Sequence, residues 1–195
     1  MFDVTAIGEL LIDMAQSGLS DIGSPIFEAN PGGAPCNVLA MLNKLGRRTA
    51  FIGKVGDDIF GQRLKNIVES TGTDIDGLVL DKDVRTTLAF VETDEHGDRS
   101  FSFYRAPGAD MMLREAEVDT DIIKHSRVLH FGTLSMTHEG VERATVKAVE
   151  AAKAAGALLS FDPNLRPPLW DSMDRARDKM SYGCSVSDTV KIEID

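Results

Sequence analysis

The apolar residues of this chain alternate between short continuous runs and longer stretches with helical spacing. The continuous runs predict buried strands, over residues 4–8, 49–53, 128–131, 157–161 and 189–192. The stretches with three- and four-residue spacing predict helices, over residues 36–45, from a cap at Asp57 or Asp58 to Gly72, 141–155 and 171–182. Strands that alternate with helices predict a parallel sheet with helices on both faces.

The middle of the chain departs from this rhythm. Residues 86–93 and 100–105 are β-branched or alternate between apolar and polar, and the polar segment 94–98 separates them. This pattern predicts a β-hairpin. Because a hairpin does not fit between parallel strands, we expect it in a small antiparallel sheet outside the main one.

Composition narrows the function classes. The chain has 195 residues, 43% of them hydrophobic, and a formal net charge of −10. The apolar content predicts a folded chain and the length predicts one domain, with room for a small addition. The acidic balance argues against a nucleic-acid binder, which needs a basic face. A small phosphorylated ligand needs only a local site and is compatible with it.

The same composition predicts a cytoplasmic protein without a membrane partner. No apolar stretch approaches the roughly 20 residues that span a bilayer, and no basic residue precedes the first apolar run, as it would in a secretory signal. The two cysteines, Cys36 and Cys184, lie far apart and have no metal-ligand spacing. We expect two reduced thiols and no metal site on the protein.

Candidate site residues follow from the predicted sheet, because ligands of such sheets bind at the carboxyl ends of the strands. One candidate is Asp13, beyond the first strand, and another is the Gly-rich string from Asn30 to Asn37. In this string Gly32 and Gly33 permit a close approach of backbone to ligand, and Asn37 can read two hydroxyls of a polyol. The alternative is a Gly-rich turn in which Asn37 caps a helix.

Two further candidates lie later in the chain. Phe101, Phe103 and Arg105 share one strand face, which predicts either an aromatic platform with a donor over a ligand or core packing with Arg105 at the rim. Phe90 on the partner strand could join the platform. Arg166 follows a strand and could donate to a sugar or phosphate oxygen; the alternative is a salt bridge with Asp162.

These segments together resemble the ribokinase-like (PfkB) sugar kinases, and most closely the bacterial fructokinases. The resemblance is carried by residues 6–13 (AIGELLID), 31–37 with Gly46 and Gly56, 51–61 (FIGKVGDDIFG) and 161–170 (FDPNLRPPLW). It covers essentially all 195 residues. One departure is Leu39, where the family motif usually has a small residue.

The resemblance implies a doubly wound α/β fold with a small β-sheet lid formed by about residues 14–33 and 85–106. It implies transfer of a phosphoryl group from ATP, with Mg²⁺, to a sugar hydroxyl, most closely that of fructose. The sugar would contact eight residues: Asp13, Gly32, Gly33, Asn37, Phe90, Phe103, Arg105 and Arg166. Lys191 and Glu193 would lie near the nucleotide. The lid of such kinases often pairs with a second subunit, so a homodimer is expected.

The family also has a later motif, Asp-Thr-x-Gly-Ala-Gly-Asp, whose last Asp is the catalytic base. These 195 residues do not contain it. We therefore interpret the sequence as the N-terminal, sugar-binding portion of a kinase, incomplete at its C-terminus and of marginal stability, and expect no substantial turnover from it alone. The alternatives are a kinase for 2-keto-3-deoxygluconate, another sugar or a nucleoside, and a non-catalytic sugar-binding fragment.

Overall fold

The main sheet is entirely parallel, as the alternation of strands and helices predicts. The structure is a computed structural model, and it describes residues 1–93 and 99–192. The strand order is β10-β9-β8-β1-β4-β5. The strands are β1 (Val4–Ile7), β4 (Thr49–Gly56), β5 (Asp74–Asp81), β8 (Val128–Gly132), β9 (Leu158–Asp162) and β10 (Thr189–Val190).

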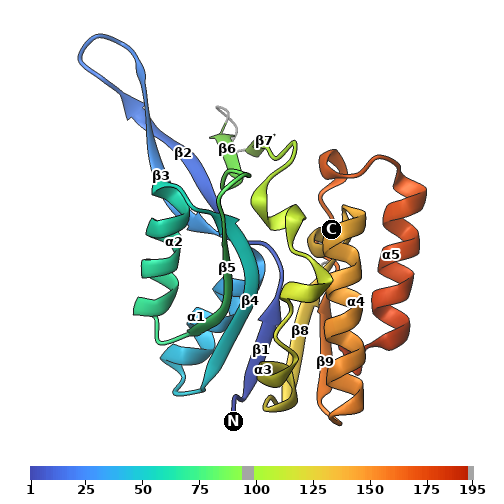
Figure 1. Cartoon of the computed structure of the whole chain (residues 1–195). Helices are drawn as coiled ribbons and strands as arrows, with labels where there is room; N and C mark the ends of the chain where they lie inside the picture. Colours follow the sequence, from blue (N-terminus) through green and yellow to red (C-terminus); the bar gives the residue numbers. More distant parts are fainter. Residues whose placement is uncertain (94–98, 193–195) are drawn as a thin grey trace.

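Helices cover both faces of this sheet (Figure 1). On one face lie α1 (Ala34–Lys44) and α2 (Ile59–Ser70), which pack Leu39 and Leu64 against Phe51. On the other face lie α3 (Thr120–Lys124), α4 (Glu139–Ala154) and α5 (Met173–Val186). Asp58 caps the start of α2, because its side chain accepts hydrogen bonds from the N–H groups of Phe60 and Gly61. Of the two predicted candidates, Asp57 and Asp58, the cap is therefore Asp58.

A second, four-stranded sheet stands at the carboxyl ends of the main strands. Its order is β3-β2-β6-β7. The strands are β2 (Leu11–Leu19), β3 (Pro25–Gly32), β6 (Leu88–Thr93) and β7 (Arg99–Tyr104). The hairpin β6–β7 is confirmed, and its predicted turn, 94–98, lies outside the described residues. The expectation of a purely antiparallel sheet is wrong, because β2 and β6 pair in parallel.

Three strands of the structure were not predicted from the pattern. β2 and β3 form a long hairpin that projects from the molecule, and their outer halves are exposed on both faces (Figure 1). Without one buried face a strand has no strong apolar alternation. β5 is the edge strand of the main sheet, and its sequence DIDGLVLD lacks the continuous apolar run of the central strands.

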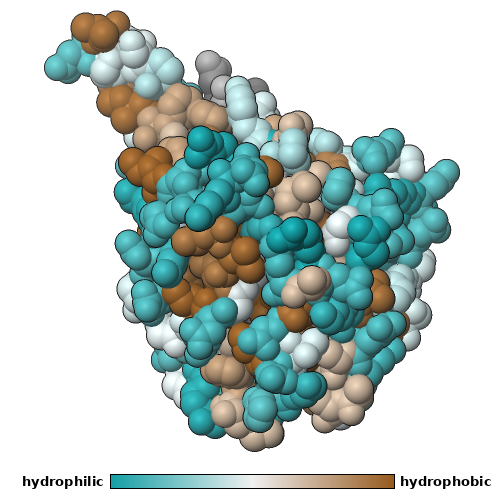
Figure 2. Space-filling model, viewed as in Figure 1, coloured by the Kyte–Doolittle hydropathy of each residue, from teal (hydrophilic) through white to brown (hydrophobic). Residues whose placement is uncertain are grey.

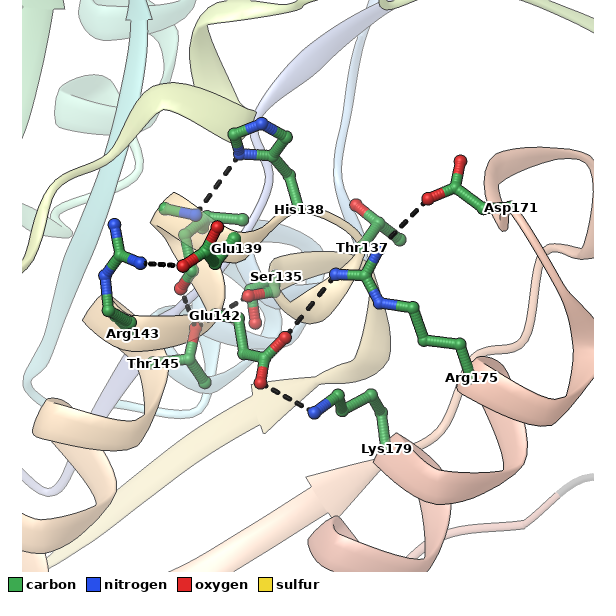
Figure 3. Close-up of polar contacts among 12 residues, drawn as sticks. Ser135, Thr137, His138, Glu139, Glu142, Arg143, Thr145, Asp171, Arg175 and Lys179 are labelled. Carbon is green, nitrogen blue, oxygen red and sulfur yellow. Dashed lines mark hydrogen bonds and ion pairs between the residues drawn. The ribbon is translucent and has the colours of Figure 1, made fainter.

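Ion pairs fasten α5 to α4. Glu142 of α4 accepts a hydrogen bond from Lys179 Nζ at 2.6 Å and pairs with Arg175 at 3.5 Å (Figure 3). Arg175 also pairs with Asp171, which lies just before α5.

Of the helices in the described part of the chain, none is both long and apolar enough to cross a membrane.

Candidate functional site

A cleft of about 230 Å³ lies between the small sheet and the carboxyl ends of the main strands. Seven of the candidate site residues line it: Asp13, Gly33, Asn37, Phe101, Phe103, Arg166 and Lys191. They come from β2, the start of α1, β7, the segment after β9 and the segment after β10. The structure therefore brings together residues that are far apart in the sequence.

The two glycines let the backbone pack tightly beside the cleft: Gly33 lines it, and Gly32 lies against Asp13. A Cβ on Gly32 would lie 2.4 Å from Asp13 Oδ2, and Gly33 has a φ of +121° that side chains rarely adopt. Gly33 also lies against the backbone of Glu9, where a Cβ would meet the carbonyl oxygen at 2.5 Å. Larger residues here would displace Asp13 or the start of α1.

Asn37 lies in the first turn of α1. Pro35 occupies this turn as expected, because its missing N–H has no helical partner there. No side chain caps the helix by a hydrogen bond at Gly33, so the alternative in which Asn37 acts as the cap does not hold. The exposed amide of Asn37 faces the cleft, with a donor and an acceptor available to a ligand.

Asp13 and Arg166 are charged residues of the cleft, and the charge of Arg166 acts on Asp13. Burial raises the pKa of the Asp13 carboxyl, and the positive charge of Arg166 lowers it in part. The partner of Asp162 is Lys191, whose Nζ lies 3.3 Å from Asp162 Oδ2, so the alternative of an Asp162–Arg166 salt bridge does not hold. Glu193, the other residue expected near a nucleotide, lies outside the described residues.

The roof of the cleft is aromatic. Phe101 and Phe103 stack with ring centroids 6.0 Å apart and an interplanar angle of 12°. Both line the cleft. Phe90 does not join them. It pairs in register with Ser102, on the opposite face of the sheet, and its ring contacts Phe27 and Tyr104.

Arg105 is placed differently from both sequence interpretations, since it lies neither at the rim nor over the cleft. Its side chain is 2% exposed and pairs with Asp110, with a nitrogen–oxygen distance of 2.6 Å. Nη2, which makes this pair, also donates to the carbonyl oxygen of Leu134, and Nη1 donates to Thr137 Oγ1. Arg105 therefore joins the end of β7 to the main domain.

Glu9 and Asn164 also line the cleft, and neither was given a role of its own from the sequence. Glu9, in the string GELLID, is 4% exposed and accepts a hydrogen bond from the N–H of Ala34. Asn164, in the string DPNLR, has a φ of +40° and turns the backbone after β9 into the cleft. In the sequence, the signal for Glu9 was its position: it is a charged residue directly after a predicted buried strand, where charged residues are uncommon unless they are paired.

The surroundings of other reactive side chains in the described part of the chain indicate a structural role for them. Burial, with the nearby charge of Glu9, raises the pKa of the Cys36 thiol well above its usual value, which disfavours a thiolate nucleophile. His130 contacts Ser160 Oγ at 3.0 Å, and burial lowers its pKa. No three His, Cys, Asp or Glu residues among those described could hold a metal ion together.

Comparison with known proteins gives one family. Residues 1–195 match the family described as "pfkB family carbohydrate kinase". The chain is 46% identical to "Probable fructokinase-6, chloroplastic" of Arabidopsis thaliana, over 97% of this chain and 50% of that protein. It is 45% identical to fructokinase-2 of Solanum habrochaites, over 97% of this chain and 58% of that protein.

Solved structures give the same result. A fructokinase from Xylella fastidiosa superposes with a TM-score of 0.91 and 36% identity, covering 97% of this chain and 59% of that one. A putative ribokinase II from E. coli, solved with ATP and Mg²⁺, superposes with a TM-score of 0.87 and 30% identity, covering 97% of this chain and 61% of that one. The chain thus spans between half and two thirds of the length of these relatives.

Proposed function

Because this chain belongs to the pfkB family of carbohydrate kinases, we propose that it forms the sugar-binding part of an ATP-dependent fructokinase. One observation carries the proposal. Asp13, Asn37 and Arg166 converge on one cleft beneath two stacked phenylalanines. Paired hydrogen-bonding groups under an aromatic cover are the chemistry that a sugar requires, since hydroxyls need partners and the ring carbons need apolar contact.

Each residue has a proposed task in sugar binding. Asp13 accepts hydrogen bonds from sugar hydroxyls, and Asn37 accepts one and donates another. Arg166 donates to a sugar oxygen or to the phosphoryl group being transferred. Phe101 and Phe103 exclude water from the sugar, and the small sheet that carries them serves as a lid, over about residues 14–33 and 85–106. Gly32 and Gly33 permit the close approach of sugar and backbone.

ATP supplies the phosphoryl group in this proposal. The Lys191 ammonium, at the mouth of the cleft, suits a phosphate oxygen. Mg²⁺ would accompany the ATP, since it is usually held by one or two carboxylates together with phosphate oxygens. The 195 residues contain no Gly-Ala-Gly-Asp string, and we expect them alone to bind fructose without sustained ADP release in a coupled assay.

Asn37→Ala tests the sugar site. The change leaves sugar hydroxyls without a partner in the bound state, which costs about 1–3 kcal/mol, or roughly a 5- to 150-fold weaker Kd for fructose by isothermal titration calorimetry. Asn66→Ala on the exposed side of α2 is the matched control and should bind as wild type does. A wild-type chain that binds no sugar would contradict the proposal.

The substrate can be separated from its alternatives in the same experiment. A kinase for 2-keto-3-deoxygluconate would bind that sugar acid more tightly than fructose, because Arg166 and Lys191 could pair with its carboxylate. A nucleoside kinase would prefer a nucleoside. A non-catalytic sugar-binding protein would bind fructose, but the intact protein would release no ADP in its presence. Melting shifts across these ligands rank their affinities.

We also propose a homodimer through the small sheet. Leu19, Ile22 and Ile26 lie at the far end of the β2–β3 hairpin and are 64%, 88% and 45% exposed. Figure 2 shows hydrophobic surface on this projection. Apolar side chains gathered on a projection are typical of interaction sites.

A cytoplasmic location stays a prediction, since one relative is named chloroplastic.

A further inference from the structure

Glu9 joins the main sheet to the first turn of α1. It lies in the link between β1, which ends at Ile7, and β2, which begins at Leu11. Its Oε1 accepts a hydrogen bond from the backbone N–H of Ala34 at 3.0 Å. Ala34 is the first residue of α1, and the free N–H groups at a helix start carry partial positive charge. This contact therefore favours the ionised form of the Glu9 carboxyl, against the opposing effect of burial.

The start of α1 depends on this contact from outside the helix. The residue before the helix is Gly33, which has no side chain, and the first turn of α1 contains no acidic residue. Asp58 and Asp119, by contrast, each precede their helix and cap it with their own carboxylate. In α1 the carboxylate comes instead from Glu9, 25 residues earlier in the chain.

The same contact fixes two residues of the sugar cleft. The Gly33 backbone lies directly on that of Glu9, since a Cβ on Gly33 would be 2.5 Å from the Glu9 carbonyl oxygen. The N–H of Asn37 donates to the carbonyl oxygen of Gly33 at 3.2 Å. A change in the Glu9 side chain acts on Ala34 through its hydrogen bond, and it reaches Asn37 through Gly33, which precedes Ala34 in the chain and accepts the hydrogen bond of Asn37.

We propose that Glu9 is a positioning residue: its ionised carboxylate holds the first turn of α1, and with it Gly33 and Asn37, in the arrangement that binds the sugar. This inference rests on the proposed function, because it concerns the same cleft. To the proposed sugar site it adds Glu9, which acts through α1. It also makes the sugar affinity depend on the charge of Glu9.

The charge of Glu9 changes near neutral pH. Burial raises the pKa of its carboxyl to about 7, against the lowering effects of the Ala34 N–H and of Arg105. The titratable and charged groups that act on Glu9 or line the same pockets come from several elements: Asp13, Cys36, Arg105, Asp110, His130, Asp162, Arg166 and Lys191. Because several of them also respond to pH, the Glu9 contribution must be isolated by substitution.

The expected direction of the pH dependence of fructose affinity follows from the strength of the hydrogen bond between Glu9 and Ala34. A hydrogen bond to an ionised acceptor is about twice as strong as one to a neutral acceptor. Ionisation of Glu9 therefore strengthens the hold on Ala34. We expect fructose to bind roughly 3- to 10-fold more tightly at about pH 8 than at about pH 6, given the usual strength of a charge at a helix start.

Glu9→Gln isolates this contribution. The amide keeps the size of the side chain and an acceptor for the Ala34 N–H, but it has no charge in this pH range. The Kd for fructose is measured by calorimetry from about pH 6 to about pH 8 for wild type, Glu9→Gln and the exposed control Glu69→Gln. The Glu9 variant should lose the pH dependence and bind at every pH as weakly as wild type does at the acidic end. A variant with the wild-type pH profile overturns the proposal.

A second measurement needs no sugar. The amide signal of Ala34 in an NMR pH titration should shift with the ionisation of Glu9 in wild type and in Glu69→Gln, and should stay constant in Glu9→Gln. If the wild-type signal does not titrate, the role of Glu9 is overturned. If it titrates while no sugar binds to wild type, the proposed sugar site is overturned instead.

Discussion

At the residue scale, the chain relies on a few buried charges, and Arg105 with Asp110 is the clearest pair. Thr87 Oγ1 also donates to Asp110, so the carboxylate has partners from two segments. A buried charge that keeps its partners is tolerated, whereas one that loses a partner is costly. The sequence could show that Arg105 was unusual on its strand, but not that Asp110, Thr137 and Leu134 surround it, because these contacts form only in the folded chain.

Arg105→Leu should destabilise the fold strongly. It leaves the Asp110 carboxylate buried without its cation, which costs about 3–5 kcal/mol of unfolding free energy. Urea denaturation monitored by circular dichroism measures the loss. Arg143→Leu removes a matched but exposed ion pair with Glu139 (Figure 3) and should change stability by less than about 1 kcal/mol. Equal losses in the two variants would contradict this account.

Glu9 should make the fold less stable as pH rises. Its pKa lies near 4.5 in an unfolded chain and at about 7 in the fold, so between these values the folded chain binds more protons. Stability therefore falls as pH rises through this window, by at most about 3 kcal/mol. Glu9→Gln removes the buried charge and should melt at a higher temperature than wild type at about pH 8, but not at about pH 5. Identical differences at the two pH values, measured by calorimetry, would argue against it.

At the element scale, the small sheet has two aromatic faces with different tasks. Phe101 and Phe103 face the cleft, while on the other face the ring of Phe90 contacts those of Phe27 and Tyr104. Strict alternation predicted correctly that Phe101 and Phe103 share a face. The placement of Phe90 depends on which residue of β7 lies opposite it and on the pairing of β6 with β2. The alternation of apolar and polar residues reveals neither register.

Phe103→Ala and Phe90→Ala should therefore separate binding from stability. Loss of Phe103 removes part of the cover over the sugar and should weaken fructose binding about tenfold, a usual effect of losing one aromatic contact. Loss of Phe90 removes the contacts with Phe27 and Tyr104 and should lower the melting temperature, with affinity nearly unchanged. Calorimetric Kd and thermal melting are measured for both variants. The reverse pattern would mean that the two faces are misassigned.

At the scale of the whole molecule, the sequence pattern predicted the central strands of the main sheet but not its edge strand β5 or the strands β2 and β3 of the small sheet. The central strands are buried on both faces and have continuous apolar runs, so their pattern is strong. The β2–β3 hairpin gave no such signal. The convergence of Asp13, Asn37 and Arg166 followed from the general rule on strand ends, whereas Glu9 and Asn164 needed the packing of the loops to be known.

The projecting hairpin also carries the prediction on assembly. If the small sheet forms the dimer contact, Ile22→Ser combined with Leu19→Ser should yield monomers, because it removes two of the most exposed apolar side chains there. Light scattering after size exclusion measures the mass of wild type and variant. The exposed Ile59→Ser on α2 is the control and should leave the mass unchanged. Wild-type monomers would refute the dimer.

The parallel pairing of β2 with β6 has a consequence for the order of folding. β2 and β3 are neighbours along the chain and can meet early, but Ile12 of β2 pairs with Leu88 of β6, across a segment that includes α1, β4, α2 and β5. Contacts between such distant segments form slowly, since a long loop must close first. The cover of the cleft is therefore completed only after half of the main sheet is in place, and ligand recognition should be among the last properties that a refolding chain acquires.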